Sequence, residues 1–82
     1  MPKTLQQCKS GKDLIAYAKS HGAEIRPGKG SHQIVMHSGK SVPVPVHGNQ
    51  QLAKGLRLAI IKAFLSMGLG MLILIYVLQF MR

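Results

Sequence analysis

The sequence predicts an α+β domain with the element order α-β-β-β-α, followed by a hydrophobic C-terminal helix. Three observations predict this class. Apolar residues recur at helical spacing near both ends of residues 1–62, three short β-like runs with glycine- or proline-containing turns lie between them, and residues 63–81 carry no charge. A chain of 82 residues can hold one small domain. We therefore divide it into a domain, 1–62, and a hydrophobic C-terminal segment, 63–82.

The first helix is predicted from its caps and its apolar stripe. Ser10 is a suitable N-cap, and Asp13 lies in the first turn, where a carboxylate favours the helix dipole. Gly22 suits the left-handed position after the last turn. The stripe consists of Leu14, Ile15 and Ala18, with Tyr17 beside it.

Three strands are predicted next, over residues 23–26, 32–37 and 42–46, separated by turns at 27–30 and 38–40. Pro43 and Pro45 cannot donate ladder hydrogen bonds, so the third strand is expected at a sheet edge. Helical spacing resumes at about Gln51. The predicted apolar face of this second helix is Leu52, Leu56, Ala59, Ile60 and Ala63.

The charge balance narrows the function. Eleven Lys and Arg residues face only two acidic residues, which gives a formal net charge of +9. So few carboxylates exclude a glycosidase acid pair or an acidic magnesium cluster. The positive field suits a phosphate polymer or an anionic lipid, and such binding should weaken steeply as salt rises. Cys8 is the only cysteine, so neither an internal disulfide nor a thiolate zinc site can form.

Three stretches together resemble the HicA (YcfA-like) mRNA interferase toxins of bacterial toxin–antitoxin systems. They are SGKDLIAYAKSHGAEIR, then GSHQIVMH, then VPVPVHGNQQLAKGLR, and they cover about residues 9–62. The chain departs from the family pattern in the spacing after Asn49 and in its long apolar C-terminus. The resemblance implies a fold like that of double-stranded-RNA-binding domains, ribosome-independent cleavage of mRNA, and a separate HicB-like antitoxin that covers the active site. It also implies that His32, in its Gly-Ser-His context, is catalytic.

Metal-independent RNA cleavage needs a base for the 2′-hydroxyl group and cations for the phosphate. An imidazole can act as that base close to neutral pH, so we expect His32 to be the general base. Glycines let the backbone approach a phosphate, and turn amides can bind its oxygens. The expected RNA-binding residues are Arg26, Lys29, Gly30, Ser31 and Lys40, with Lys40 opposite His32 if the second and third strands form a hairpin.

Simpler roles remain open for these residues. His32 could be a strand histidine with one hydrogen bond, and Ser31 a turn residue, since no Ser–His–Asp set can be assembled from so few carboxylates. His37 and His47 could meet across adjacent strands, but two histidines without a third ligand make a poor metal site. We expect no metal and no cofactor.

The uncharged segment predicts a membrane anchor. Nineteen residues, 63–81, reach roughly 28 Å as a helix, close to the ~30 Å hydrocarbon thickness. Basic residues precede the segment, so the domain is expected on the cytoplasmic side of the inner membrane, tail-anchored by this single pass. The alternatives are a helix buried in an oligomer and a C-terminus replaced by a change of frame.

Two other functions are compatible with the same residues. One is a non-catalytic RNA-binding module, whose binding would not depend on His32. The other is a membrane-associated basic protein with a vestigial toxin domain, which would bind anionic vesicles without competition from RNA. Few aromatic residues are available to stack on bases, so no sequence-specific recognition is predicted.

Overall fold

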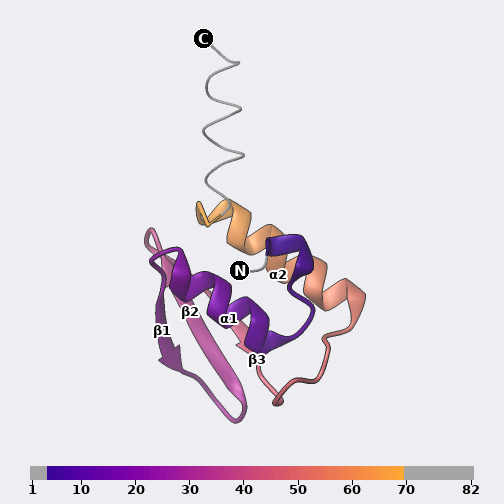
Figure 1. The fold of residues 1–82 in the computed structure, drawn as a ribbon. Coiled ribbons are helices and arrows are strands. Elements are labelled where there is room, and N and C mark those ends of the chain that lie inside the picture. The colour runs from indigo at the N-terminus through magenta and orange to yellow at the C-terminus, as the bar shows by residue number, and fades with distance from the viewer. Residues whose placement is uncertain (1–3, 70–82) are drawn as a thin grey trace.

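The computed structural model describes residues 4–69 of the chain. A short 3-10 helix precedes one helix, three strands and a second helix (Figure 1). These elements are η1 (Leu5–Gln7), α1 (Gly11–Ser20), β1 (Glu24–Pro27), β2 (His32–His37), β3 (Lys40–Pro45) and α2 (Lys54–Ser66). The predicted α-β-β-β-α order is confirmed.

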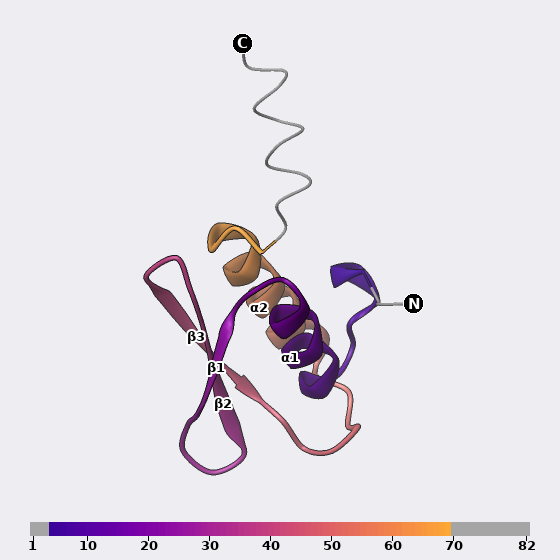
Figure 2. The same cartoon turned by 60° about the vertical axis from the view of Figure 1, so that its left-hand side comes forward.

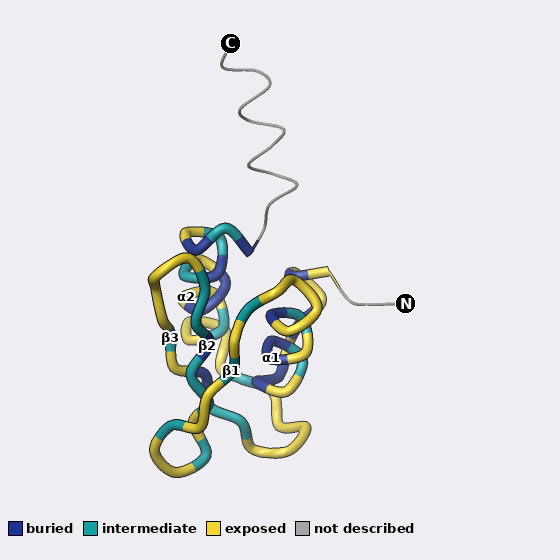
Figure 3. Tube along the Cα trace, turned by 90° about the vertical axis from the view of Figure 1, so that its left-hand side faces the viewer, coloured by how far each residue is buried: buried dark blue, intermediate teal, exposed yellow. Residues whose placement is uncertain are grey.

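The three strands form an antiparallel sheet in the order β1-β2-β3, so β3 is an edge strand, as its two prolines predicted. Both helices pack on one face of this sheet (Figure 2). The core lies between the two layers. Its buried apolar residues are Leu5, Cys8, Leu14, Ile15, Ala18, Val35, Val44, Ile60, Ile61, Phe64, Met67 and Leu69. The turn between β1 and β2 and the loop after β3 are largely exposed (Figure 3).

Helix α1 has the caps that its sequence predicted. The Ser10 side chain accepts a hydrogen bond from the Asp13 N–H at 3.1 Å. At the other end, Gly22 has a φ of +88° and donates its N–H to the Lys19 carbonyl. The N–H of Ala23 donates to the Ala18 carbonyl at 3.0 Å, which completes a Schellman motif.

Helix α2 begins at Lys54 and not near Gln51, because the preceding residues pair with the N-terminal segment. The Leu52 N–H donates to the Lys9 carbonyl at 2.9 Å, and Gln51 forms an isolated bridge with Ser10. The buried face also differs from the predicted one, since Leu56 is 45% exposed and Ala59 is exposed. The buried positions of α2 are Ile60, Ile61 and Phe64.

The hydrophobic segment does not continue α2 as one unbroken helix. Gly68 has a φ of +84°, and the Leu69 N–H donates to the Phe64 carbonyl at 2.9 Å, a second Schellman motif that ends the helix. Phe64, Met67 and Leu69 are buried in the core, so the first seven residues of the predicted anchor belong to the folded domain.

The membrane anchor predicted over residues 63–81 stays a prediction, since most of this range lies outside the described residues. Within residues 4–69, no helix combines the length and the apolar character needed to cross a membrane. Residues 70–82 lie outside the described part of the chain.

Candidate active site

The turn between β1 and β2 presents His32 at the end of the sheet. Two backbone hydrogen bonds, each of 3.0 Å, close the turn: the Gly28 N–H donates to the His32 carbonyl, and the His32 N–H donates to the Lys29 carbonyl. Gly30 has a φ of +58°, a conformation that favours glycine. The His32 side chain is therefore exposed on a backbone that the strand pairing holds in place.

Glycine at position 28 suits the close approach of the turn to β2. A Cβ atom at Gly28 would lie 3.0 Å from Ile34 Cδ1 and 3.1 Å from the His32 carbonyl oxygen. Both distances are shorter than ordinary van der Waals contact. The lack of a side chain at Gly28 thus avoids a tight contact with Ile34 and with the His32 carbonyl oxygen.

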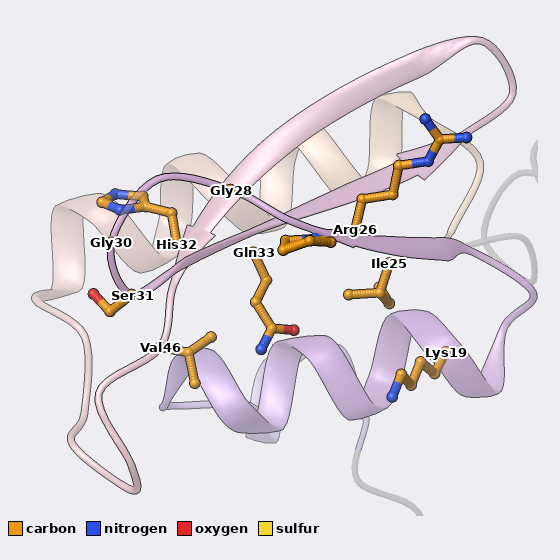
Figure 4. A pocket seen from close by; sticks show the side chains of 10 residues that line it. Lys19, Ile25, Arg26, Gly28, Gly30, Ser31, His32, Gln33 and Val46 are labelled. Carbon is orange, nitrogen blue, oxygen red and sulfur yellow. The ribbon is translucent and has the colours of Figure 1, made fainter.

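His32 projects from the face of the sheet that the described helices do not cover. Side chains alternate along β2, so Val35, which is fully buried, faces the helices, whereas His32 and Ile34 face away. Figure 4 shows Arg26 and His32 pointing away from α1, and Gln33 pointing toward it. Arg26, which pairs with Ile34, and His32 therefore lie on the same uncovered face of the sheet.

A hollow of about 440 Å³ lies at this end of the sheet. Its lining includes Lys19, Arg26, Gly28, Gly30, Ser31 and His32 (Figure 4). Arg26 forms an ion pair of 3.4 Å with Glu24, and both side chains are 61% exposed. Exposed pairs contribute little, so Glu24 competes only weakly with a phosphate for the guanidinium group.

Three of the expected RNA-binding residues line the same hollow as His32, and a fourth lies in the adjoining turn. Arg26, Gly30 and Ser31 line the same hollow, and Lys29 is exposed in the turn directly before them. Lys40 lies elsewhere. The second and third strands do form a hairpin, but Lys40 pairs with His37 at the opposite end of β2, and its Nζ donates to the Ser66 carbonyl at 3.2 Å.

The strand register also separates His37 from His47, which could have met across adjacent strands. His37 Nδ1 donates to the Met67 carbonyl at 2.7 Å, at the end of α2. His47 follows β3 beyond Pro45, the partner of His32, and therefore lies at the other end of the hairpin. Within residues 4–69, no three His, Cys, Asp or Glu side chains are grouped so that they could hold a metal ion.

Sequence reasoning missed the contact between Ser31 and His47. Ser31 Oγ and His47 Nε2 lie 3.1 Å apart, although sixteen positions separate the two residues. The Val46 N–H also donates to the Ser31 carbonyl at 3.0 Å. The alternation of valine and proline before His47 predicted a strand that ends near this residue. Only the register of β3 against β2 shows that His47 lies beside Ser31.

Comparison with known proteins identifies the family of the chain. The sequence model of a family described as "HicA toxin of bacterial toxin-antitoxin" matches residues 11–64. A curated protein of Pseudomonas fluorescens (strain Pf0-1), named "Probable mRNA interferase HicA", is 44% identical over 46 residues, which is 56% of this chain and 77% of that protein. No solved structure matches the chain significantly. Since the family match includes both helices, the sheet and the His32 turn, the chain belongs to the HicA toxin family.

Proposed function

We propose that this protein is the toxin of a type II toxin–antitoxin system, an endoribonuclease that cleaves mRNA in the cytoplasm. The observation that carries the proposal is the exposed His32, held at the end of the sheet by a closed glycine turn within the residues that match the family. The name of the Pseudomonas relative supports mRNA as the substrate.

His32 acts as the general base in this proposal, and no metal takes part. Neutral imidazole removes the proton from a ribose 2′-hydroxyl group, and the 2′-oxygen attacks the adjacent phosphorus. Arg26 and Lys29 balance the charge that accumulates on the phosphate oxygens. Gly28 and Gly30 let the RNA backbone approach the turn amides, which are further donors for the same oxygens.

A HicB-like antitoxin is the partner that the family implies, and the uncovered face of the sheet suits it. Ile34 and Met36 are half-buried there, and Pro43 is exposed. A protein that packs on these apolar side chains also covers His32, which lies on the same face. Inhibition then follows from simple exclusion of the RNA.

The test is incubation of the purified full-length chain with a mixed-sequence RNA in EDTA, beside the variants His32→Ala and His21→Ala. His21 is also exposed but lies at the end of α1, so it is the matched control. We expect fragments with a 2′,3′-cyclic phosphate from the wild type and from His21→Ala, and none from His32→Ala.

Two results would contradict the proposal. Intact RNA bound equally well by the wild type and by His32→Ala would make the protein an RNA-binding module. Cleavage by His32→Ala at the wild-type rate would remove the base from His32.

A further inference from the structure

The proposed reaction still needs a proton donor for the leaving 5′-oxygen. When the bond between phosphorus and the 5′-oxygen breaks, that oxygen must take up a proton. The chain has two carboxyl side chains, and neither lies at His32. Asp13 lies in the first turn of α1, and Glu24 pairs with Arg26 at the start of β1.

Ser31 is the hydroxyl group nearest in sequence to the reacting centre. It directly precedes His32 in the chain, and both residues line the hollow at this end of the sheet. Figure 4 shows their side chains at the same end of that hollow, beside Gly30. A serine hydroxyl group by itself is a poor acid, so it needs a group that resupplies its proton.

His47 is placed to be that group. Its Nε2 lies 3.1 Å from Ser31 Oγ, within hydrogen-bonding distance. The hydrogen bond from the Val46 N–H to the Ser31 carbonyl holds the two segments together at this point. The His47 side chain is exposed, so it can exchange protons with water.

We propose that Ser31 and His47 form a proton relay that protonates the leaving 5′-oxygen; the inference rests on the proposed function. His32 takes the proton of the 2′-hydroxyl group, the 2′-oxygen bonds to phosphorus, and the bond to the 5′-oxygen breaks. The 5′-oxygen takes the proton of the Ser31 hydroxyl group, and Ser31 takes one from Nε2 of the His47 imidazolium. The products are a 2′,3′-cyclic phosphate and a 5′-hydroxyl group, and both histidines return to their starting states through solvent.

The test compares two leaving groups. The wild-type cleavage site is first mapped on RNA, and oligonucleotides are then made with either oxygen or sulfur as the 5′ bridging atom at that site. A thiolate leaves without a proton, because a thiol pKa of about 8.5 is far below that of an alcohol. Cleavage rates are measured for the full-length wild type, His47→Gln, Ser31→Ala and the control His21→Gln.

The relay predicts a specific pattern. His47→Gln can still hydrogen-bond to Ser31 but cannot supply an acidic proton, so it should cleave the oxygen substrate on the order of 10²-fold more slowly. On the sulfur substrate it should be close to the wild type. Ser31→Ala should show the same selective rescue, and His21→Gln should match the wild type on both substrates.

Each other outcome is informative. A wild type that cleaves neither substrate would overturn the proposed function. If the wild type cleaves both, a His47→Gln protein that is unaffected, or slowed equally on the two substrates, would overturn the relay alone. Ser31→Ala serves as the second variant, with thermal unfolding showing that each protein is folded.

Discussion

Gly11 is the position where a single added methyl group should damage this fold most. A Cβ atom at Gly11 would overlap the Pro45 carbonyl oxygen and would lie 2.9 Å from the Pro45 carbonyl carbon and 3.2 Å from Val46 Cα. All three are backbone atoms, so no side-chain rotation relieves the overlap. Ordinary contact between heavy atoms is about 3.5 Å, so α1 and the end of β3 would have to separate by on the order of 1 Å.

We expect Gly11→Ala to lower the free energy of unfolding by about 3 kcal/mol, the upper end of the usual cost of overpacking. The better helix propensity of alanine, up to about 1 kcal/mol, offsets only part of this. A domain of this size has a total stability of roughly 3–10 kcal/mol, so the loss is a large fraction.

Gly55 is the matched control, because a Cβ atom there meets no atom within 4 Å. Gly55 lies in the first turn of α2 and is exposed, so Gly55→Ala should stabilise the protein by about 0.5–1 kcal/mol. Urea unfolding followed by circular dichroism measures both variants. A Gly11→Ala protein within about 0.5 kcal/mol of the wild type would refute the close approach of α1 to β3.

Three further predictions concern the end of α2, the pH dependence and the basic side chains. Leu69→Ala should lower the free energy of unfolding by about 2–5 kcal/mol, because this side chain is fully buried. The control Leu58→Ala removes a side chain that is 44% exposed and should change the free energy by less than about 1 kcal/mol. Similar values for the two variants in urea unfolding would place Leu69 outside the core. Burial raises the pKa of the Tyr17 hydroxyl group above its ordinary 10.0, and Coulombic repulsion from Cys8 raises it further. The contribution of Tyr17 to stability is therefore complete below about pH 10 and is lost as the pH rises through the raised pKa. The difference in stability between the wild type and Tyr17→Phe, measured from pH 8 to pH 11, should therefore shrink only above about pH 10, and a difference constant with pH would contradict the shift. Lys29→Ala should reduce the slope of log affinity for RNA against log salt concentration by about 1. Lys40→Ala should change this slope much less, because Lys40 donates to the Ser66 carbonyl at the other end of the sheet. Equal slopes for the two variants would refute the assignment of Lys29, and not Lys40, to the RNA site.

Much of the fold could be predicted because its signals are local. The Ser10 cap and the left-handed Gly22 define α1 through contacts within a few residues. Pro43 and Pro45 exclude β3 from the centre of the sheet whatever its neighbours are. The glycine turn before His32 depends only on backbone freedom, so the turn could be predicted from the sequence, whereas the catalytic role of His32 came from the family resemblance.

The predictions that differed from the structure all depended on contacts between distant segments. The start of α2 is delayed because Leu52 pairs with Lys9 instead of entering the helix. The apolar run from residue 63 indicated one long helix. However, Gly68 adopts a left-handed conformation that ends the helix, and Leu69 is buried in the core. Propensity and hydropathy are properties of a window, and neither reports such pairing.

The sequence by itself therefore determined the class of fold, the basic character of the surface and the glycine turn before His32, because capping, proline geometry, glycine freedom and charge act within the window that contains them. The tertiary structure decided which groups accompany His32. The register of β3 against β2 takes Lys40 away from the site and brings His47 to Ser31. Register is set by the packing of alternate side chains against both helices, and a shift of one residue would reverse every side chain, so only the assembled sheet specifies the chemistry at its end.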